Sequence, residues 1–253
     1  MLKFYAIISA YFILFAAVLL CFSDTFIIAL LLGVLTFIFL IILVWGVSNI
    51  RSQMFYKTFN SNPKAKGKVA ITFDDGPDSR NTILLLELLE RYGAKASFFL
   101  IGQNIKNNRS IAERIHSEGH LIGNHSYFHN NLFPAKSTNT IVKELEDTQV
   151  LLKNIKNQDN IFFRPPFGVS NPNIAKAVSK IGLTVVGWNI RSFDTRKKLS
   201  REKVVQNITK NLKSGDIILM HDYTEDIPWV LEQVLEHLAK SSLVSVTVEQ
   251  LME

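Results

Sequence analysis

The stretch Val69-Ala-Ile-Thr-Phe-Asp-Asp-Gly-Pro77 sets an apolar segment directly before two adjacent carboxylates and a turn. Branched and aromatic side chains favour extended backbone and Gly-Pro ends it, so residues 69–73 are expected to form a buried strand. Six more apolar stretches follow, at 96–101, 121–123, 161–164, 183–188, 217–220 and 243–246. Amphipathic helical stretches separate them, at about 81–92, 109–118, 139–153, 173–181, 201–212 and 228–239. Seven β/α alternations predict a parallel sheet, either open and doubly wound or closed as a barrel one unit short of eight.

The first fifty residues have a different composition from the rest of the chain. They contain one Lys and one Asp, whereas the whole chain carries 28 Lys and Arg, 22 Asp and Glu, and a net charge of +6. Residues 4–22 and 26–47 lack charges and are each about as long as a membrane-crossing helix, so residues 1–50 are expected to form a transmembrane helical hairpin. A cleaved signal peptide over residues 1–22 is the alternative. A lipoprotein modified at Cys21 is disfavoured, because Leu20 stands at the position where a lipoprotein signal needs a small residue.

Residues 51–68 are polar and are expected to link the hairpin to one domain at 69–253. Lys3, Arg51 and Lys57 flank the hairpin and Asp24 lies in its turn, so the positive-inside rule places the body in the cytoplasm. A large domain can override that rule. Basic residues after the hairpin could contact anionic lipid. The sequence pI of 9.3 would permit nucleic-acid binding, but no recognition motif accompanies it, so nucleic acid is not expected as a partner.

Polar side chains gather at the carboxyl ends of the expected strands, the edge where parallel α/β folds build their sites. They are Asp74, Asp75, His125, His129, Arg164, Trp188, Asp194 and His221. Two His at i, i+4 with one carboxylate would make a three-ligand metal site with a position open for water, the catalytic pattern. Of the adjacent Asp74 and Asp75, one can bind the metal while the other accepts a proton, and His221 can protonate a leaving group.

Four segments resemble motifs of the polysaccharide deacetylases, the NodB homology domain of carbohydrate esterase family 4. They are Thr72-Phe-Asp-Asp-Gly-Pro77, His125-Ser-Tyr-Phe-His129, Arg164-Pro-Pro-Phe-Gly168 and Ile218-Leu-Met-His-Asp222, in the family's order and spacing. The resemblance covers about residues 66–252. It implies a distorted (β/α)7 barrel, one divalent metal ion, usually Zn²⁺ with Co²⁺ as a substitute, and hydrolysis of an acyl group from an amino sugar.

By this resemblance each motif residue takes a role. The metal ligands would be Asp75, His125 and His129. The catalytic groups would be the base Asp74, Arg164 that holds it, and the acid His221 held by Asp194. The acyl group would meet the backbone N–H of Phe167 and a pocket walled by Trp188 and Leu219. The family commonly has Trp after the residue aligned with Asp194, whereas Thr195 follows it here, which puts one wall of the sugar groove in doubt.

The expected function is a membrane-anchored, metal-dependent deacetylase in which metal-bound water attacks the N-acetyl group of an amino sugar. A polymer such as peptidoglycan requires an outward-facing body, whereas a cytoplasmic body favours a lipid-linked sugar bearing acetyl or formyl. The rival hypotheses are an inactive glycan-binding or scaffold protein and an O-acetyl esterase of the same fold. The sequence says nothing of the oligomeric state.

Overall fold

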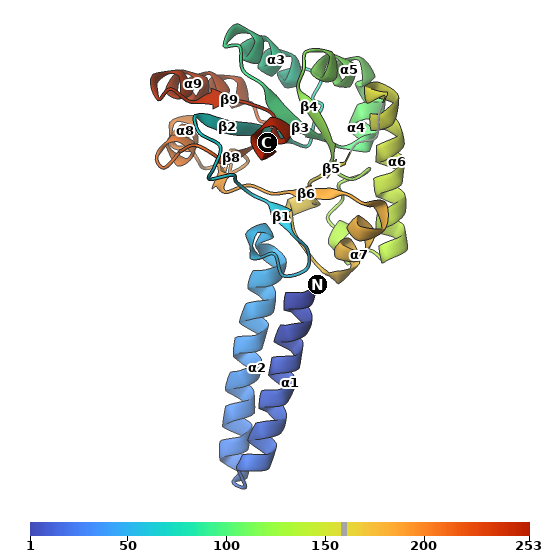
Figure 1. Cartoon of the computed structure of the whole chain (residues 1–253), viewed down its shortest axis with the longest axis vertical. Coiled ribbons are helices and arrows are strands. Elements are labelled where there is room, and N and C mark those ends of the chain that lie inside the picture. Colours follow the sequence, from blue (N-terminus) through green and yellow to red (C-terminus); the bar gives the residue numbers. More distant parts are fainter. Residues whose placement is uncertain (158–160) are drawn as a thin grey trace.

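The structure is a computed structural model that describes residues 1–157 and 161–253, and it comprises an apolar helical hairpin and an α/β body (Figure 1). The strands are β1 (Thr58–Phe59), β2 (Lys68–Asp74), β3 (Ala96–Leu100), β4 (Leu121–Asn124), β5 (Phe162–Phe163), β6 (Thr184–Val186), β7 (Ile190–Arg191), β8 (Ile217–His221) and β9 (Val244–Ser245). The body helices are α3 (Asn81–Arg91), α4 (Gly102–Asn107), α5 (Arg109–Ser117), α6 (Thr138–Lys156), α7 (Pro172–Ile181), α8 (Arg201–Thr209), α9 (Ile227–Lys240) and α10 (Val248–Met252). Three short 3-10 turns complete it, η1 (Ile50–Ser52), η2 (Phe133–Ala135) and η3 (Pro166–Gly168).

The sheet is parallel and curls into a barrel. Its strand order is β1-β6-β5-β4-β3-β2-β8-β7, and β9 pairs with the start of β2. In the part of the chain that the structure describes, no pairing joins β7 to β1, so the barrel is open there. The expected (β/α)7 barrel is confirmed. The short elements β1, β7, α4 and α10 were not expected.

The two-residue period of the strands sorts their side chains between the inside and the outside of the barrel. On β2, Val69, Ile71 and Phe73 pack outward against the helices, while Ala70 lies in the interior cluster. Thr72 and Asp74 share the inner face with Ala70 by the same alternation. β8 repeats the pattern, with Ile217 inside and His221 two positions beyond Leu219 on that face. The barrel geometry therefore directs Asp74 and His221 toward one end of the interior.

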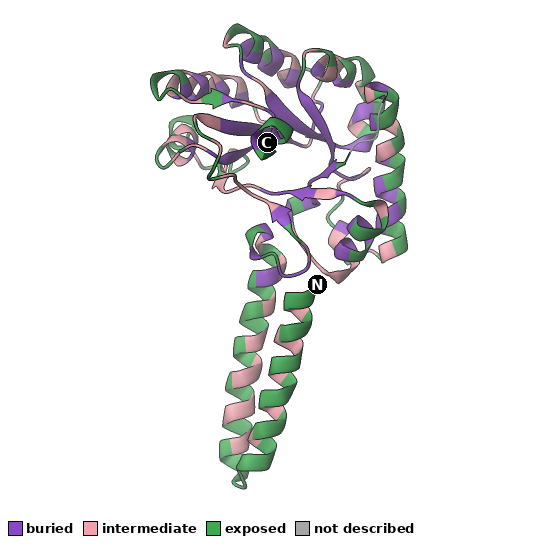
Figure 2. Ribbon diagram, in the orientation of Figure 1, coloured by how far each residue is buried: buried purple, intermediate pink, exposed green. Residues whose placement is uncertain are grey.

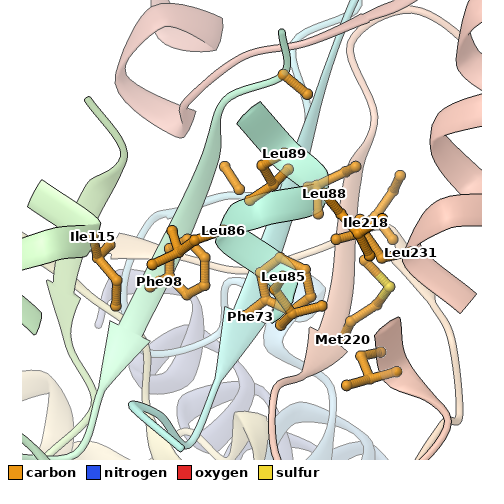
Figure 3. Close-up of a cluster of buried hydrophobic side chains, with 14 of the residues drawn as sticks. Phe73, Leu85, Leu86, Leu88, Leu89, Phe98, Ile115, Ile218, Met220 and Leu231 are labelled. Atoms are coloured by element: carbon orange, nitrogen blue, oxygen red, sulfur yellow. The ribbon is translucent and has the colours of Figure 1, made fainter. Parts of the chain in front are cut away.

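The main core lies between the sheet and its helical layer. Figure 3 shows side chains of α3, among them Leu85, Leu86 and Leu89, packed over Phe73 and Phe98, whose rings stack with centroids 5.0 Å apart. Figure 2 shows most of the sheet buried, with β9 partly exposed, whereas the hairpin is largely exposed. This packed core holds the strand ends, and the side chains on them, in fixed positions.

Helices α1 (Leu2–Cys21) and α2 (Thr25–Ser48) form the hairpin. Their mean hydropathies are 2.4 and 3.3, and no part of the apolar window of either is buried. The two helices contact each other through stacked rings of Tyr11 and Phe39, and Asp24 accepts a hydrogen bond from the Ile27 N–H at the turn. Their length and composition suit a membrane crossing, a test that a signal sequence near the N-terminus also passes.

The segment expected as a polar linker, residues 51–68, is largely packed on the body in the structure. Its β1 pairs with β6, and Met54 and Phe55 are buried. The hairpin is fastened as well, because the Met1 ammonium donates to Phe55 O at 2.7 Å and Ser170 N–H donates to the Val47 carbonyl of α2 at 2.9 Å. Burial of Met54 and Phe55 stabilises the packed arrangement, so the segment is a strap docked on the body rather than a free tether.

Candidate active site

A cavity of about 380 Å³ opens at the carboxyl ends of the barrel strands. Eight of the ten predicted site residues line it, and they are Asp74, Asp75, His125, His129, Phe167, Trp188, Leu219 and His221. The other two, Arg164 and Asp194, lie directly behind Asp74 and His221. Segments that are far apart in the sequence thus converge at one edge of the sheet, as the strand-end argument predicts.

Asp75, His125 and His129 form a compact donor cluster whose ligand atoms lie within 4.8 Å of one another. Asp75 Oδ1 is 3.4 Å from His125 Nε2 and 3.3 Å from His129 Nε2. That oxygen is buried and has no hydrogen-bond partner. A buried carboxylate oxygen without a partner, facing two imidazole nitrogens, fits the donor set of a divalent metal ion.

The orientation of His125 supports the same assignment. Its Nδ1 lies 2.8 Å from the Arg164 carbonyl, so Nδ1–H donates there and the Nε2 lone pair faces the cluster. His129 is held in a left-handed backbone conformation, with φ 50°, and its N–H donates to Ser126 Oγ. The loop between β4 and α6 therefore turns both imidazoles toward Asp75.

Burial and the charges of neighbouring residues set the pKa values of the cluster. Burial alone would raise the pKa of Asp75, but the positive charges of the neighbouring His125 and His129 outweigh burial and bring the pKa down to about 2. Burial and the neighbouring His125 lower the pKa of His129 to about 4. At neutral pH Asp75 is thus a carboxylate and His129 a neutral imidazole, the forms that bind a metal ion.

Asp74 has a different environment from its neighbour. Arg164 NH1 donates to Asp74 Oδ1 at 2.7 Å and also to Thr72 Oγ1, while its NH2 donates to the Gly187 carbonyl. The guanidinium lies over the ring of Phe99 and is fully buried. Burial lowers the pKa of Arg164 and the charge of Asp74 opposes that effect, while these hydrogen bonds hold the guanidinium and the Asp74 carboxyl in one geometry.

His221, at the end of the neighbouring strand β8, forms a second pair with Asp194. His221 Nδ1 lies 3.0 Å from Asp194 Oδ1, and the His221 backbone N–H donates to Asp194 Oδ2 at 2.7 Å. Ser192 Oγ donates to the same carboxylate. Burial would lower the pKa of His221, but the hydrogen bond and charge of Asp194 outweigh it and raise the pKa above its usual value. The imidazolium form is therefore favoured and its Nε2–H is the proton at hand.

The walls of the cavity match the predicted acyl pocket. Trp188 and Leu219 line it, and Phe167 lies 46% exposed at its edge with its ring 4.6 Å from that of His129. Gly168 has φ 67°, and a Cβ there would overlap the Trp188 ring. A glycine is therefore required for the loop after β5 to approach Trp188 this closely.

Four residues of the site were not predicted. Arg191, Thr195 and Tyr223 line the cavity, and Thr195 stands where the family commonly has Trp. Asp222 is buried beneath the turn after Asp75 and accepts a hydrogen bond from Thr82 at 2.6 Å. Burial raises the pKa of Asp222 to about 7. Asp222 falls inside a recognised motif and Thr195 stands at the family's Trp position, so both positions were usable signals, whereas Arg191 and Tyr223 are seen only in the folded cavity.

Comparison with known proteins agrees with the geometry. The family model described as polysaccharide deacetylase matches residues 61–186. A peptidoglycan-N-acetylglucosamine deacetylase of Bacillus cereus is 34% identical over 197 residues, which are 75% of this chain and 90% of the relative. The chain belongs to the polysaccharide deacetylase family. This membership classes it as a hydrolase that acts on carbon–nitrogen bonds of amino sugars.

Other relatives of the family are longer than this chain. It covers 58% of a second Bacillus cereus peptidoglycan-N-acetylglucosamine deacetylase, at 36% identity over 64% of this chain, and 40% of one from Listeria monocytogenes, at 32% identity over 75%. Among solved structures, a peptidoglycan N-acetylglucosamine deacetylase in complex with 4-naphthalen-1-yl-N-oxidanyl-benzamide superposes with a TM-score of 0.70 at 31% identity, covering 76% of this chain and 91% of that one. A family 4 carbohydrate esterase from Streptomyces lividans does so with a TM-score of 0.66, also at 31% identity, covering 72% and 92%.

Proposed function

We propose that this glycan deacetylase is metal-dependent, is anchored by its helical hairpin, and removes the N-acetyl group from an N-acetylglucosamine-containing glycan near the bilayer. The observation that carries the proposal is the cavity in which Asp75, His125 and His129 face one another beside the Asp74–Arg164 and His221–Asp194 pairs. Each group needed to activate water, receive a proton and release an amine is present within that one cavity.

Asp75, His125 and His129 would hold the divalent ion. When bound, a divalent ion such as Zn²⁺, or Co²⁺ in its place, supplies Lewis-acid activation of water and of the amide carbonyl. His125 is prepared for this role by its Nδ1–H bond to the Arg164 carbonyl, which leaves Nε2 as the donor atom. Asp74 Oδ2 lies 3.7 Å from that Nε2, close to the cluster without belonging to it.

Asp74 acts as the general base in this proposal. Its Oδ1 is engaged by Arg164, which leaves Oδ2 directed at the cluster to accept a proton from the attacking water. The fixed guanidinium prevents Asp74 from rotating. The wall formed by Trp188 and Leu219 places the acetyl methyl, and the backbone N–H of Phe167 serves the developing oxyanion.

His221 acts as the general acid. Asp194 accepts from Nδ1 and so keeps the Nε2 proton on the imidazolium, from which it passes to the amine nitrogen as the carbon–nitrogen bond breaks. The products are acetate and a free amino sugar. A catalytically idle member of the fold would lack one of these groups, and the retention of the whole set argues for turnover.

The side of the membrane decides which glycan is reached. The curated relatives named above act on peptidoglycan by their names, and a polymer of that kind lies outside the cytoplasmic membrane. The charges of Lys3, Arg51 and Lys57 instead favour a cytoplasmic body, where a lipid-linked amino sugar would take the polymer's place. Protease added to intact spheroplasts separates the two, because only an outward-facing body is digested.

The decisive test uses the full chain purified in detergent. We expect about one equivalent of bound divalent metal, acetate release from an N-acetylglucosamine oligomer or a lipid-linked N-acetyl sugar, loss of that release with a chelator, and recovery on adding Zn²⁺ or Co²⁺. Extraction of membranes with alkaline carbonate tests the anchor separately. Undiminished acetate release after exhaustive chelation would refute the metal-dependent mechanism.

A further inference from the structure

A second and larger cavity, of about 860 Å³, lies outside the active site where the hairpin meets the body. Its two sides are the strap that leads into β1, from Phe55 to Phe59, and helix α7 with the residues after it. Met1 also lines it, so the cavity reaches the N-terminal end of α1. Figure 1 shows the N-terminus, β1 and α7 together at this junction. We call this cavity the junction groove.

The junction groove is basic. Lys57, Lys176 and Lys180 line it, and none of its lining residues is acidic. All three lysines are exposed, and in the described part of the chain none of them makes an ion pair or a hydrogen bond. Lys176 and Lys180 are four residues apart on α7 and so lie on one face of the helix. The charges therefore reinforce one another and are open to an anion.

The floor of the groove is apolar. Phe55, Ala175, Val178 and Val185 line it below the lysines and are buried. Three lining residues, Thr58, Ser179 and Thr184, carry hydroxyls, of which that of Thr58 donates to the Ile50 carbonyl. An occupant that matches this lining carries an anionic group, hydrogen-bond acceptors next to it, and a hydrocarbon portion beyond them.

The position of the groove identifies the source of such an occupant. Helix α1 begins at Leu2, beside Met1 of the groove lining. The end of α2 is held to the body at Ser170, two residues before α7 begins, by the Ser170 bonds to Gly46 O and Val47 O. If the hairpin crosses the bilayer, the groove lies at the level of the lipid headgroups. A phosphate in this layer is already positioned to meet lysines, each of which gains about 1 kcal/mol near an anionic surface.

We propose that the junction groove binds the headgroup of an anionic phospholipid, with the phosphate held by Lys57, Lys176 and Lys180 and the glycerol backbone and upper methylenes resting on the apolar floor. The bound lipid fixes the body on the membrane surface and so sets the height of the catalytic cavity above it. The chain connection between the anchor and the catalytic cavity is short. Ser170, which binds the end of α2, follows Phe167 of the catalytic cavity by three residues. The proposal rests on the membrane anchoring proposed above.

The test titrates short-chain phosphatidylglycerol and, separately, phosphatidylcholine into the full chain in neutral detergent, with retained lipid counted by native mass spectrometry. We expect one phosphatidylglycerol bound in preference to phosphatidylcholine. The variant Lys57→Gln/Lys176→Gln/Lys180→Gln should bind it roughly a hundredfold more weakly, given about fivefold for each of the three lysines. The matched control Lys106→Gln/Lys143→Gln/Lys210→Gln removes three exposed charges elsewhere and should bind like the wild type.

A variant that changes the shape of the groove distinguishes specific binding in the groove from nonspecific electrostatic attraction of the lipid. Ser179→Trp adds bulk at the groove and leaves the charge unchanged, so it should also weaken phosphatidylglycerol binding. Equal binding by the groove and control variants would overturn the proposal, as would inorganic phosphate competing as well as the lipid. Acetate release from a soluble oligomer should be unchanged in the triple variant. If the wild-type chain shows no preference for phosphatidylglycerol over phosphatidylcholine but still resists carbonate extraction, the groove proposal is refuted and the membrane anchor stands.

Discussion

The two sides of the catalytic cavity differ in how their polar atoms are satisfied. On the β2–β4 side, Asp75 Oδ1 is buried without a hydrogen-bond partner, and two imidazole nitrogens stand more than 3 Å from it. On the β7–β8 side, Asp194 accepts hydrogen bonds from Ser192 Oγ and from the backbone and ring of His221. The protein thus completes one side by itself, whereas the other leaves a set of donor atoms that fits a divalent ion. A site built from its own hydrogen bonds should withstand chelation, and a site left open should not.

The largest expected effect comes from the β2–β4 side, where Asp75, His125 and His129 lie. His125→Ala removes a ligand from the cluster, so the full chain should lose its metal and its acetate release should fall to background. Metal content by atomic spectroscopy and acetate release are the measurements. His237→Ala is the matched control, since His237 lies on α9 away from the cavity. Retention of metal by the His125 variant would show that the cluster is not the metal site.

Asp74 tests whether the adjacent carboxylates do different work. Asp74→Asn keeps the acceptor for Arg164 and deletes the base, so we expect a fall in kcat of roughly 10²- to 10⁴-fold with the metal retained. Asp75→Asn should lower metal content as well. The comparison of metal content between these two variants is the critical measurement, and an equal loss in both would contradict the assignment of base and ligand.

On the β7–β8 side, a substitution should change the pH dependence of activity and leave the metal content unchanged. Asp194→Asn removes the hydrogen bond and charge that raise the pKa of His221, so the imidazolium is lost at lower pH than in the wild type. The alkaline limb of the kcat/KM profile should therefore move to lower pH, with metal content unchanged. A pH profile that keeps its alkaline limb would mean that His221 is not the acid held by Asp194.

The smallest expected effect concerns Leu219, which lines the apolar wall of the catalytic cavity. Leu219→Ala enlarges the acyl pocket, so cleavage of a propionyl or butyryl analogue should improve relative to acetyl by about tenfold, the scale at which an apolar pocket discriminates a methylene. The ratio of kcat/KM values for the two acyl groups is the measurement. An unchanged ratio would place the acyl group elsewhere in the cavity.

Local patterns in the sequence were sufficient for most of the barrel. The seven expected strands correspond to β2, β3, β4, β5, β6, β8 and β9, because each is an apolar run bounded by turn residues. β1 and β7 are two residues long and lie in polar surroundings, so they have no period to detect. They exist because a neighbouring strand supplies the pairing, a contact made across more than a hundred residues for β1 and β6.

Residues 51–68 also show what local sequence cannot predict, because a segment expected to be a linker is packed on the body. Their Asn, Lys and Pro content indicated a linker, yet Phe55 is buried and Thr58 pairs with Val185. Composition averages over a segment, whereas burial depends on which few side chains find an apolar surface to cover. The basic lining of the junction groove arises in the same way, since Lys57 and Lys176 have no relation in the sequence.

The sequence by itself determined the alternation of strands and helices, the carboxyl-end positions of Asp74, Asp75 and His221, the His125–His129 spacing, and the apolar hairpin, since all of these are local in the chain. Tertiary structure alone decided that Arg164 reaches Asp74 across ninety residues, that Asp75 Oδ1 is left without a partner, and that a basic groove forms at the foot of the hairpin. The physical reason is that hydrogen bonds, burial and cavities belong to pairs and groups of residues, which only the packed barrel brings into contact.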